Sequence, residues 1–376
     1  MEVKLEDILG REPLVDYPWR YEVDRLIEWL IDKDSHIRSF CFDLIMSSAY
    51  IDATSGIEKS IEQCKEVENY NSHLGFINLC SPCYIKKDKW TYQKAVKPQS
   101  GALGKLSSEI ILRFVEKLYP QIEEVISVGG TEVADAKIKH QNGMVILAEV
   151  KSAPLLTYPF LFNVPESCLK GHHEKIIITN SQLRACDSAI FFHGIGAISL
   201  GNVGGDLWPF KPLVDFLIDD RNSQFIQVCI DDWLSAREAY SEKDRSNKMY
   251  YLANASGNPP KIAKERDGWP EKMSISDSKT SAGMDRTDDI KKGIYQTLKI
   301  GTELKSDPFI KTAIISNLPA YRHGDEYVDP FVNMFWGLDD DILDLNGQKA
   351  ILYEDLRRAF DFIITLEDPI LRDIEL

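Results

Sequence analysis

Residues 131–151, TEVADAKIKHQNGMVILAEVK, carry the pattern that decides how the middle of this chain folds. The first ten residues contain alternating apolar and polar side chains, an arrangement suited to a strand. Gln141-Asn142-Gly143 is a hairpin-loop signal, since asparagine and glycine accept the backbone angles of a tight turn. The run MVILAEVK is strongly apolar and predicts a second strand near the centre of a sheet. The stretch therefore predicts an antiparallel hairpin.

Three charged residues lie at the end of this predicted hairpin that is opposite its loop. Successive strand residues point to opposite faces, so Glu149 and Lys151, two residues apart, share one face. Asp135 lies on the partner strand. Carboxylates supply hard oxygen ligands for divalent metal ions, and a nearby lysine can orient or deprotonate a water molecule. The three residues form a candidate site for metal-dependent hydrolysis, and a solvated Glu/Lys pair at a strand edge is the simpler alternative.

The length of the loop decides whether Asp135 joins this face. With a three-residue loop, His140 pairs with Met144, and Asp135 then pairs with Glu149. A regular two-residue turn would instead put the two carboxylates on opposite faces. Three-residue loops commonly carry a glycine in the left-handed conformation at the position of Gly143. We therefore expect the three-residue loop, with Gly143 at a positive φ.

A predicted helix precedes the hairpin. It spans about 103–118 and ends before Pro120, because proline cannot continue a helix. The segment VISV, residues 125–128, then predicts a short strand. Glu109 lies on the helix at the rim of its apolar face, so its carboxylate points either toward the sheet or to solvent. Both interpretations stay open from the sequence.

The order of Glu109, Asp135 and Glu149-Val150-Lys151 resembles the PD-(D/E)XK nuclease superfamily, especially type II restriction endonucleases. The resemblance covers about 101–154 and departs from the pattern at residue 134, where alanine replaces the motif's proline. It implies a mixed central sheet flanked by helices, Mg²⁺-dependent cleavage of DNA, and often a homodimer that acts on a short palindrome. It further implies that Asp135 and Glu149 bind Mg²⁺, that Lys151 positions the attacking water, and that Glu109 is another acid at the metal.

The rest of the chain extends this core into an α/β fold with a restriction-endonuclease-like centre. We expect a helical N-terminal region over 1–100, a nuclease core over 101–320, and an acidic, helical C-terminal region over 321–376. The core's further predicted elements are strands at KIIIT (175–179), AIFFHGIGAISL (189–200) and FIKTAIISNL (309–318), a helix at about 288–298, and a long polar insertion near 240–286.

The composition restricts the protein's location and partners. The net charge of −15 argues against a protein that coats nucleic acid by charge alone. The sequence has no apolar run of membrane-spanning length, and the acidic start, MEVKLEDILG, lacks the layout of a signal peptide. Its seven scattered cysteines are typical of reduced thiols. These features predict a cytoplasmic protein.

One segment has the opposite charge from the chain as a whole. From Lys86 to Lys105 there are six lysines against one acid, whereas the chain from Asp339 onward has eleven acids and four bases. Lysines suit phosphates, and aromatic rings can stack beside them. A solvated basic loop is the alternative. The residues expected to contact DNA are Lys86, Lys87, Lys89, Trp90, Lys94 and Lys97.

Two other motifs are candidates for a functional site. Asp277-Ser278-Lys279 is a second acid-x-lysine motif, but no acid-bearing hairpin precedes it. Some relatives carry a glutamine on the helix after the catalytic strand, so Gln296 can close the fold even if the site is at Glu149. Cys80 and Cys83 have zinc-ligand spacing, although no second ligand pair follows them.

Three classes of function therefore remain. The first is a type II restriction endonuclease that cuts double-stranded DNA at a specific short sequence, with Mg²⁺ as cofactor. Such an enzyme is expected to be a homodimer with a separately encoded DNA methyltransferase. The second is a repair or phage nuclease of the same fold with low sequence specificity. The third is a non-catalytic DNA-binding protein in which the acids are structural.

Overall fold

The chain divides into two compact units. Unit 1 comprises Met1–Val15, Ser107–Ala153 and Ala282–Leu376, and unit 2 comprises Asp16–Leu106 and Pro154–Ser281. The predicted boundaries at 100 and 320 differ from this division, because the chain leaves unit 1 at Pro154 and returns at Ala282. The computed structural model describes residues 14–55, 59–63, 72–74, 100–128, 134–158, 160–165, 175–192, 195–244, 246–247, 249–250, 281–303, 309–372 and 374–376.

Unit 1 is built on a mixed five-stranded sheet in the order β15-β10-β5-β4-β3. Strand β4 is antiparallel to both of its neighbours, β3 and β5, whereas β10 runs parallel to both β5 and β15. Strand β5 is central, and five of its six residues are buried, which explains its unbroken apolar sequence. The prediction of a mixed central sheet is confirmed. The strands are β3 (Ile122–Ser127), β4 (Ala136–His140), β5 (Val145–Val150), β10 (Ile310–Ile315) and β15 (Phe362–Ile364).

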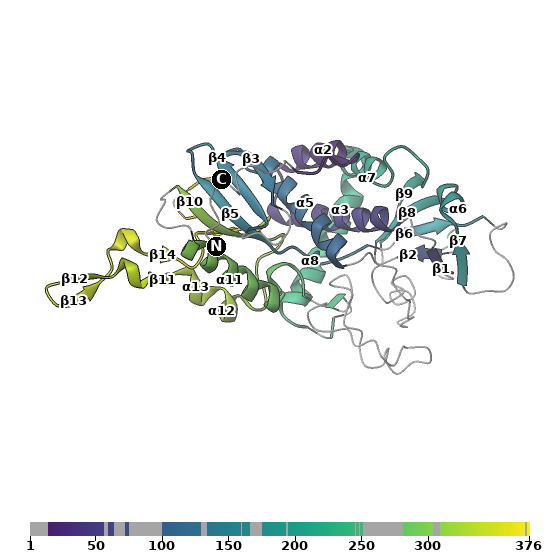
Figure 1. Cartoon of the computed structure of the whole chain (residues 1–376). Coiled ribbons are helices and arrows are strands. Elements are labelled where there is room, and N and C mark those ends of the chain that lie inside the picture. The colour runs from purple at the N-terminus through teal and green to yellow at the C-terminus, as the bar shows by residue number, and fades with distance from the viewer. Residues whose placement is uncertain are drawn as a thin grey trace. The chain divides into compact units, whose positions relative to one another are not determined.

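Helices flank this sheet, as predicted. Helix α11 (Thr287–Glu303) lies beside β5 and β10 (Figure 1). Ile300 packs against Leu147 in a small buried cluster, so this face of β5 is the one that α11 covers. Gly293 lets the helix approach closely, since a Cβ there would lie 3.5 Å from the Ile314 side chain. Helix α5 (Ser100–Leu118) leads into the sheet and ends before Pro120, as the sequence predicts.

The hairpin between β4 and β5 has the predicted three-residue loop. The His140 amide donates to the Met144 carbonyl at 2.9 Å, and Gly143 has a φ of +84°. The register pairs Ala136 with Ala148. Asp135 directly precedes β4, and its amide donates to the Ala148 carbonyl of β5 at 3.0 Å. Asp135 therefore emerges beside the end of β5.

The C-terminal region differs from the prediction. Residues 321–376 were expected to be helical, and this was wrong. Two four-residue helices begin the region, and short strands and 3₁₀ turns follow. The apolar run Phe362–Ile364 is buried and extends the central sheet as β15, because aromatic and β-branched residues fit a pleated, buried surface. The elements are α12 (Gly324–Tyr327), α13 (Asp329–Val332), β11 (Phe335–Trp336), η5 (Asp339–Asp341), β12 (Leu343–Leu345), β13 (Gln348–Ala350), η6 (Tyr353–Asp355) and β14 (Arg357–Arg358).

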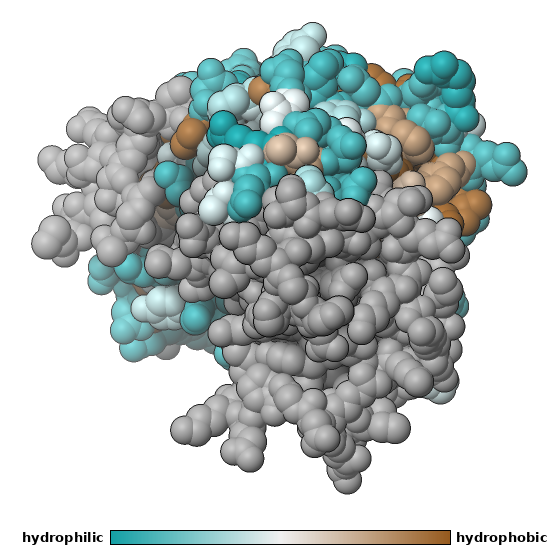
Figure 2. Space-filling model, turned by 90° about the vertical axis from the view of Figure 1, so that its right-hand side faces the viewer, coloured by the Kyte–Doolittle hydropathy of each residue, from teal (hydrophilic) through white to brown (hydrophobic). Residues whose placement is uncertain are grey.

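Unit 2 combines helices with an antiparallel sheet in the order β7-β1-β2-β6-β8-β9. Helices α2 and α3 lie in the region 1–100 that was predicted to be helical, but strands β1 and β2 also lie there, so that prediction was correct only in part. The run 189–200 is divided between β8 and β9. Most of the described surface in the view of Figure 2 is hydrophilic. The elements are α2 (Arg20–Leu30), α3 (Ser35–Ser55), β1 (Lys59–Gln63), β2 (Ser72–Leu74), β6 (Phe160–Asn163), β7 (Lys175–Ile178), α6 (Asn180–Arg184), β8 (Asp187–Phe192), β9 (Gly196–Asn202), α7 (Phe210–Leu217), η2 (Asp220–Asn222) and α8 (Ser223–Ser241).

A buried carboxylate organises the core of unit 2. Asp43 on α3 has 0% exposed surface. It accepts hydrogen bonds from the amides of Leu155 and Leu156 at 3.1 and 2.8 Å, and from Trp233 Nε1 at 2.8 Å. These bonds fix the segment that follows Pro154 and join it to α3 and α8.

In the part of the chain that the structure describes, no helix has both the length and the apolarity needed to cross a membrane.

Candidate active site

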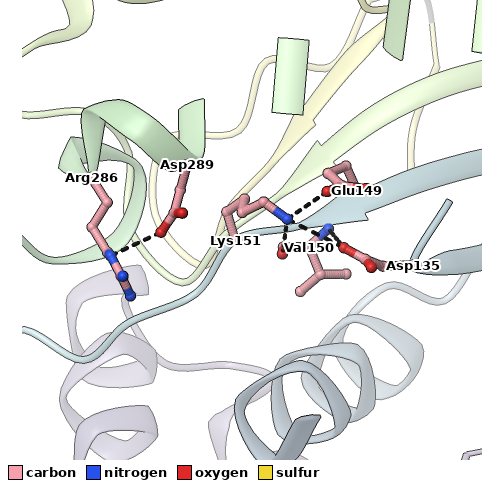
Figure 3. A network of polar contacts seen from close by, with 6 residues as sticks. All are labelled: Asp135, Glu149, Val150, Lys151, Arg286 and Asp289. Carbon is pink, nitrogen blue, oxygen red and sulfur yellow. Dashed lines mark hydrogen bonds and ion pairs between the residues drawn. The ribbon is translucent and has the colours of Figure 1, made fainter. Parts of the chain in front are cut away.

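The candidate site lies at the carboxyl end of β5. Leu147 packs against α11, and residues two apart on a strand share a face, so Glu149 and Lys151 also point to the α11 side. Asp135 reaches the same place from the segment before β4 (Figure 3). The structure therefore brings together the three charged side chains that the sequence singled out.

Lys151 joins the two carboxylates. Its Nζ atom lies 2.5 Å from Glu149 Oε1 and 3.4 Å from Asp135 Oδ2, and it also donates to the Val150 carbonyl at 3.1 Å. The Val150 amide donates to Asp135 Oδ2 at 2.9 Å, which orients that carboxylate toward the strand end. Both acids thus hold the Lys151 ammonium group between them.

The electrostatics of this cluster follow from its partial burial. Glu149 is 7% exposed. Burial raises the pKa of Glu149 to about 7, and the nearby Asp135 charge adds to this effect. Burial lowers the pKa of Lys151, but the charges of Asp135, Glu149 and Asp289 outweigh it and raise the pKa overall. The site therefore attracts cations, and it holds Glu149 near the midpoint of its titration at neutral pH.

The first turn of α11 adds two more charged residues. Asp289 lies close enough to contribute to the Lys151 pKa, and its Oδ2 atom forms an ion pair with Arg286 Nε at 2.8 Å. Figure 3 shows Asp289 between Arg286 and Lys151. Asp289 was missed in the sequence analysis. Acids at the start of a helix ordinarily reflect the helix dipole, so local sequence gave no signal of this role.

Glu109 does not join the contacts of the cluster. It is 5% exposed, and its Oε2 atom accepts a hydrogen bond from the Val15 amide at 3.2 Å. The buried location is inconsistent with an ordinary surface glutamate. Its role at a metal stays a prediction.

Asp135 and Glu149 are the residues of this cluster that could hold a divalent metal ion. Among the described residues, no group of three or more His, Cys, Asp or Glu side chains is placed to hold a metal ion. Mg²⁺ commonly binds through one or two carboxylates and takes its remaining ligands from water and substrate phosphates. Asp135 and Glu149 supply this donor set, and the repulsion between them is the kind that a divalent cation relieves.

Several predicted residues fall elsewhere. The DNA-contact segment from Lys86 to Lys97, the pair Cys80 and Cys83, and the rival motif at Asp277 and Lys279 lie outside the described residues. Gln296 is on α11, the helix that packs against β5. We predicted that a helix carrying Gln296 could close the fold around a site at Glu149. The packing of α11 against β5 agrees with this arrangement.

The pKa of Glu149 leads to a prediction about stability. The folded state holds the proton to about pH 7, whereas an unfolded glutamate releases it near pH 4.3. In EDTA, the free energy of unfolding should therefore fall as the pH rises from about 4.5 to about 7, by roughly 2 kcal/mol relative to Glu149→Gln. Melting temperatures of both proteins across this range check the prediction.

Magnesium should act in the opposite direction, since it binds the ionised carboxylate. Mg²⁺ should raise the melting temperature of the unsubstituted protein more at pH 8 than at pH 6, and have less effect on Glu149→Gln. Identical pH profiles for the two proteins would contradict the shifted pKa.

Comparison with known proteins found no matching family model, no similar curated protein and no similar solved structure.

Proposed function

We propose that this chain is a type II restriction endonuclease, a Mg²⁺-dependent enzyme that hydrolyses phosphodiester bonds of double-stranded DNA at a specific short sequence. The observation that carries the proposal is the meeting of Asp135, Glu149 and Lys151 at the end of β5. The 2.5 Å and 3.4 Å contacts of Lys151 Nζ bring a cation and two hard-ligand carboxylates to one point. This combination suits attack of water on a phosphate.

Each residue has a distinct role in this proposal. Asp135 and Glu149 would hold Mg²⁺, with Glu109 as a further acid of the site. Bound Mg²⁺ would stabilise charge on the phosphate and lower the pKa of a coordinated water. Lys151 orients the attacking water, because its ammonium is fixed by both acids and by the Val150 carbonyl. The Val150 amide keeps Asp135 in place.

The proposed biological setting follows from the same resemblance. The enzyme would be a cytoplasmic homodimer acting on double-stranded DNA, with the matching DNA methyltransferase encoded separately. Incubation of plasmid DNA with the protein and Mg²⁺ tests the proposal. Discrete bands would support a site-specific endonuclease, a smear would favour a repair or phage nuclease of low specificity, and intact DNA would refute a nuclease.

The basic segment gives a prediction about DNA binding. Neutralising Lys86, Lys87 and Lys89 together should weaken binding about tenfold or more, because lysines that neutralise phosphates release counterions. The plot of log affinity against log salt concentration should become shallower by about 0.9 for each lost contact. Fluorescence anisotropy over a series of salt concentrations measures this slope. An unchanged slope would mean that the segment is a solvated loop.

A further inference from the structure

Arg286 lies at the beginning of α11, next to the candidate site. Its side chain is 38% exposed, and its Nε atom is ion-paired with Asp289 Oδ2 at 2.8 Å. Asp289 is 22% exposed and contributes to the electrostatics of Lys151. Figure 3 shows this ion pair next to the Lys151 cluster.

The backbone around Arg286 is held firmly. Just before it, the Gly283 amide donates to the Ala153 carbonyl at 2.9 Å, two residues beyond Lys151. Asp285, fully buried, accepts from the amides of Arg322 and His323 at 2.8 and 3.1 Å. These bonds tie the start of α11 to the end of the catalytic strand, so Arg286 is preorganised at the site.

The same strand end is braced from β10. Ala153 exchanges two hydrogen bonds with the Asn317 side chain, at 2.9 Å to Oδ1 and 2.8 Å from Nδ2. The Lys151 amide donates to the Ile315 carbonyl at 2.8 Å. Little freedom remains between Lys151 and the residues that position Arg286.

A phosphodiester needs cationic donors that the rest of this network does not offer. Asp135, Glu149 and Asp289 are acids, and a substrate phosphate is an anion. The ammonium of Lys151 contacts Glu149, Asp135 and the Val150 carbonyl, and in the proposed function it serves the attacking water. Within the described residues, the terminal nitrogens of Arg286 contact no acceptor. Its planar fork can therefore bind two oxygens of a phosphate.

We propose that Arg286 binds a backbone phosphate of the polynucleotide at this site and that Asp289 is the positioning residue that orients its guanidinium. This inference rests on the proposed nuclease function and extends it to the substrate contact. The phosphate it takes is one near the Lys151 ammonium, because the bond from the Gly283 amide to the Ala153 carbonyl holds the start of α11 beside the strand end that carries Lys151.

The test is single-turnover cleavage of a duplex that contains a site cut by the protein, with Mg²⁺, over a series of enzyme and salt concentrations. Arg286→Ala should raise the half-saturating concentration about tenfold or more and reduce the salt slope by about 0.9. Arg286→Lys should retain the slope but recover only part of the affinity, because it keeps the charge and loses the fork. Asp289→Asn should weaken binding less than Arg286→Ala.

Lys349→Ala is the matched control, since it removes one exposed positive charge from β13 of the same unit. It should leave affinity and slope unchanged, and melting temperatures should show that every variant is folded. If the unsubstituted protein cleaves DNA and Arg286→Ala keeps its affinity and salt slope, the role of Arg286 is refuted while the nuclease proposal stands. If the unsubstituted protein cleaves no DNA, both are refuted.

Discussion

Glu149→Ala and Lys151→Ala are each expected to reduce DNA cleavage roughly 10³-fold or more while leaving DNA affinity within a few-fold of its original value. Glu149→Ala removes a carboxylate that is proposed to bind the metal. Lys151→Ala removes the ammonium that lies 2.5 Å from that carboxylate. Both changes act on the chemical step, since substrate affinity arises from a larger contact surface. Single-turnover cleavage rates and separate binding measurements distinguish the two effects.

The design includes a rival variant and a folding check. Asp277→Ala should have far less effect, because the hairpin that brings the acids together is at Glu149. Normal cleavage by either Glu149→Ala or Lys151→Ala would remove the central assignment. Loss of activity in Asp277→Ala together with normal cutting by Glu149→Ala would move the site to the second motif. Melting curves ensure that lost cleavage does not reflect lost folding.

The second large effect concerns the stability of unit 2. Asp43→Ala is expected to lower the free energy of unfolding by about 3 kcal/mol or more, because it leaves two buried amides and the Trp233 indole without their acceptor. For a unit of this size, that corresponds to a fall in melting temperature of roughly 5–10 °C. Differential scanning calorimetry measures both quantities.

A matched pair of variants isolates the hydrogen bonds. Asp231→Ala removes an exposed acid from α8 and should change stability by less than about 0.5 kcal/mol. Trp233→Phe removes one donor and keeps most of the packing, so its effect should be intermediate. Equal stabilities for Asp43→Ala and Asp231→Ala would show that the buried carboxylate contributes little.

Local sequence was enough to predict the hairpin of the candidate site. Its strands are neighbours in the chain, and a single glycine at positive φ sets the loop length, so the register that brings Asp135 to Glu149 depends on a few adjacent residues. The apolar run FIKTAIISNL likewise predicted β10, because a buried strand leaves a nearly continuous apolar sequence.

Tertiary structure decided the features that depend on distant segments. The acidic C-terminal region gives one strand to the central sheet, which its charge did not suggest, because only three apolar residues make that contact. Asp43 is a fully buried acid on α3, and its three donors come from segments far along the chain. The Asp289 charge acts on Lys151 only because α11 packs against β5 after the chain has passed through unit 2. Local periodicity reports which face of an element is buried, whereas the identity of its partner is set by how distant elements pack.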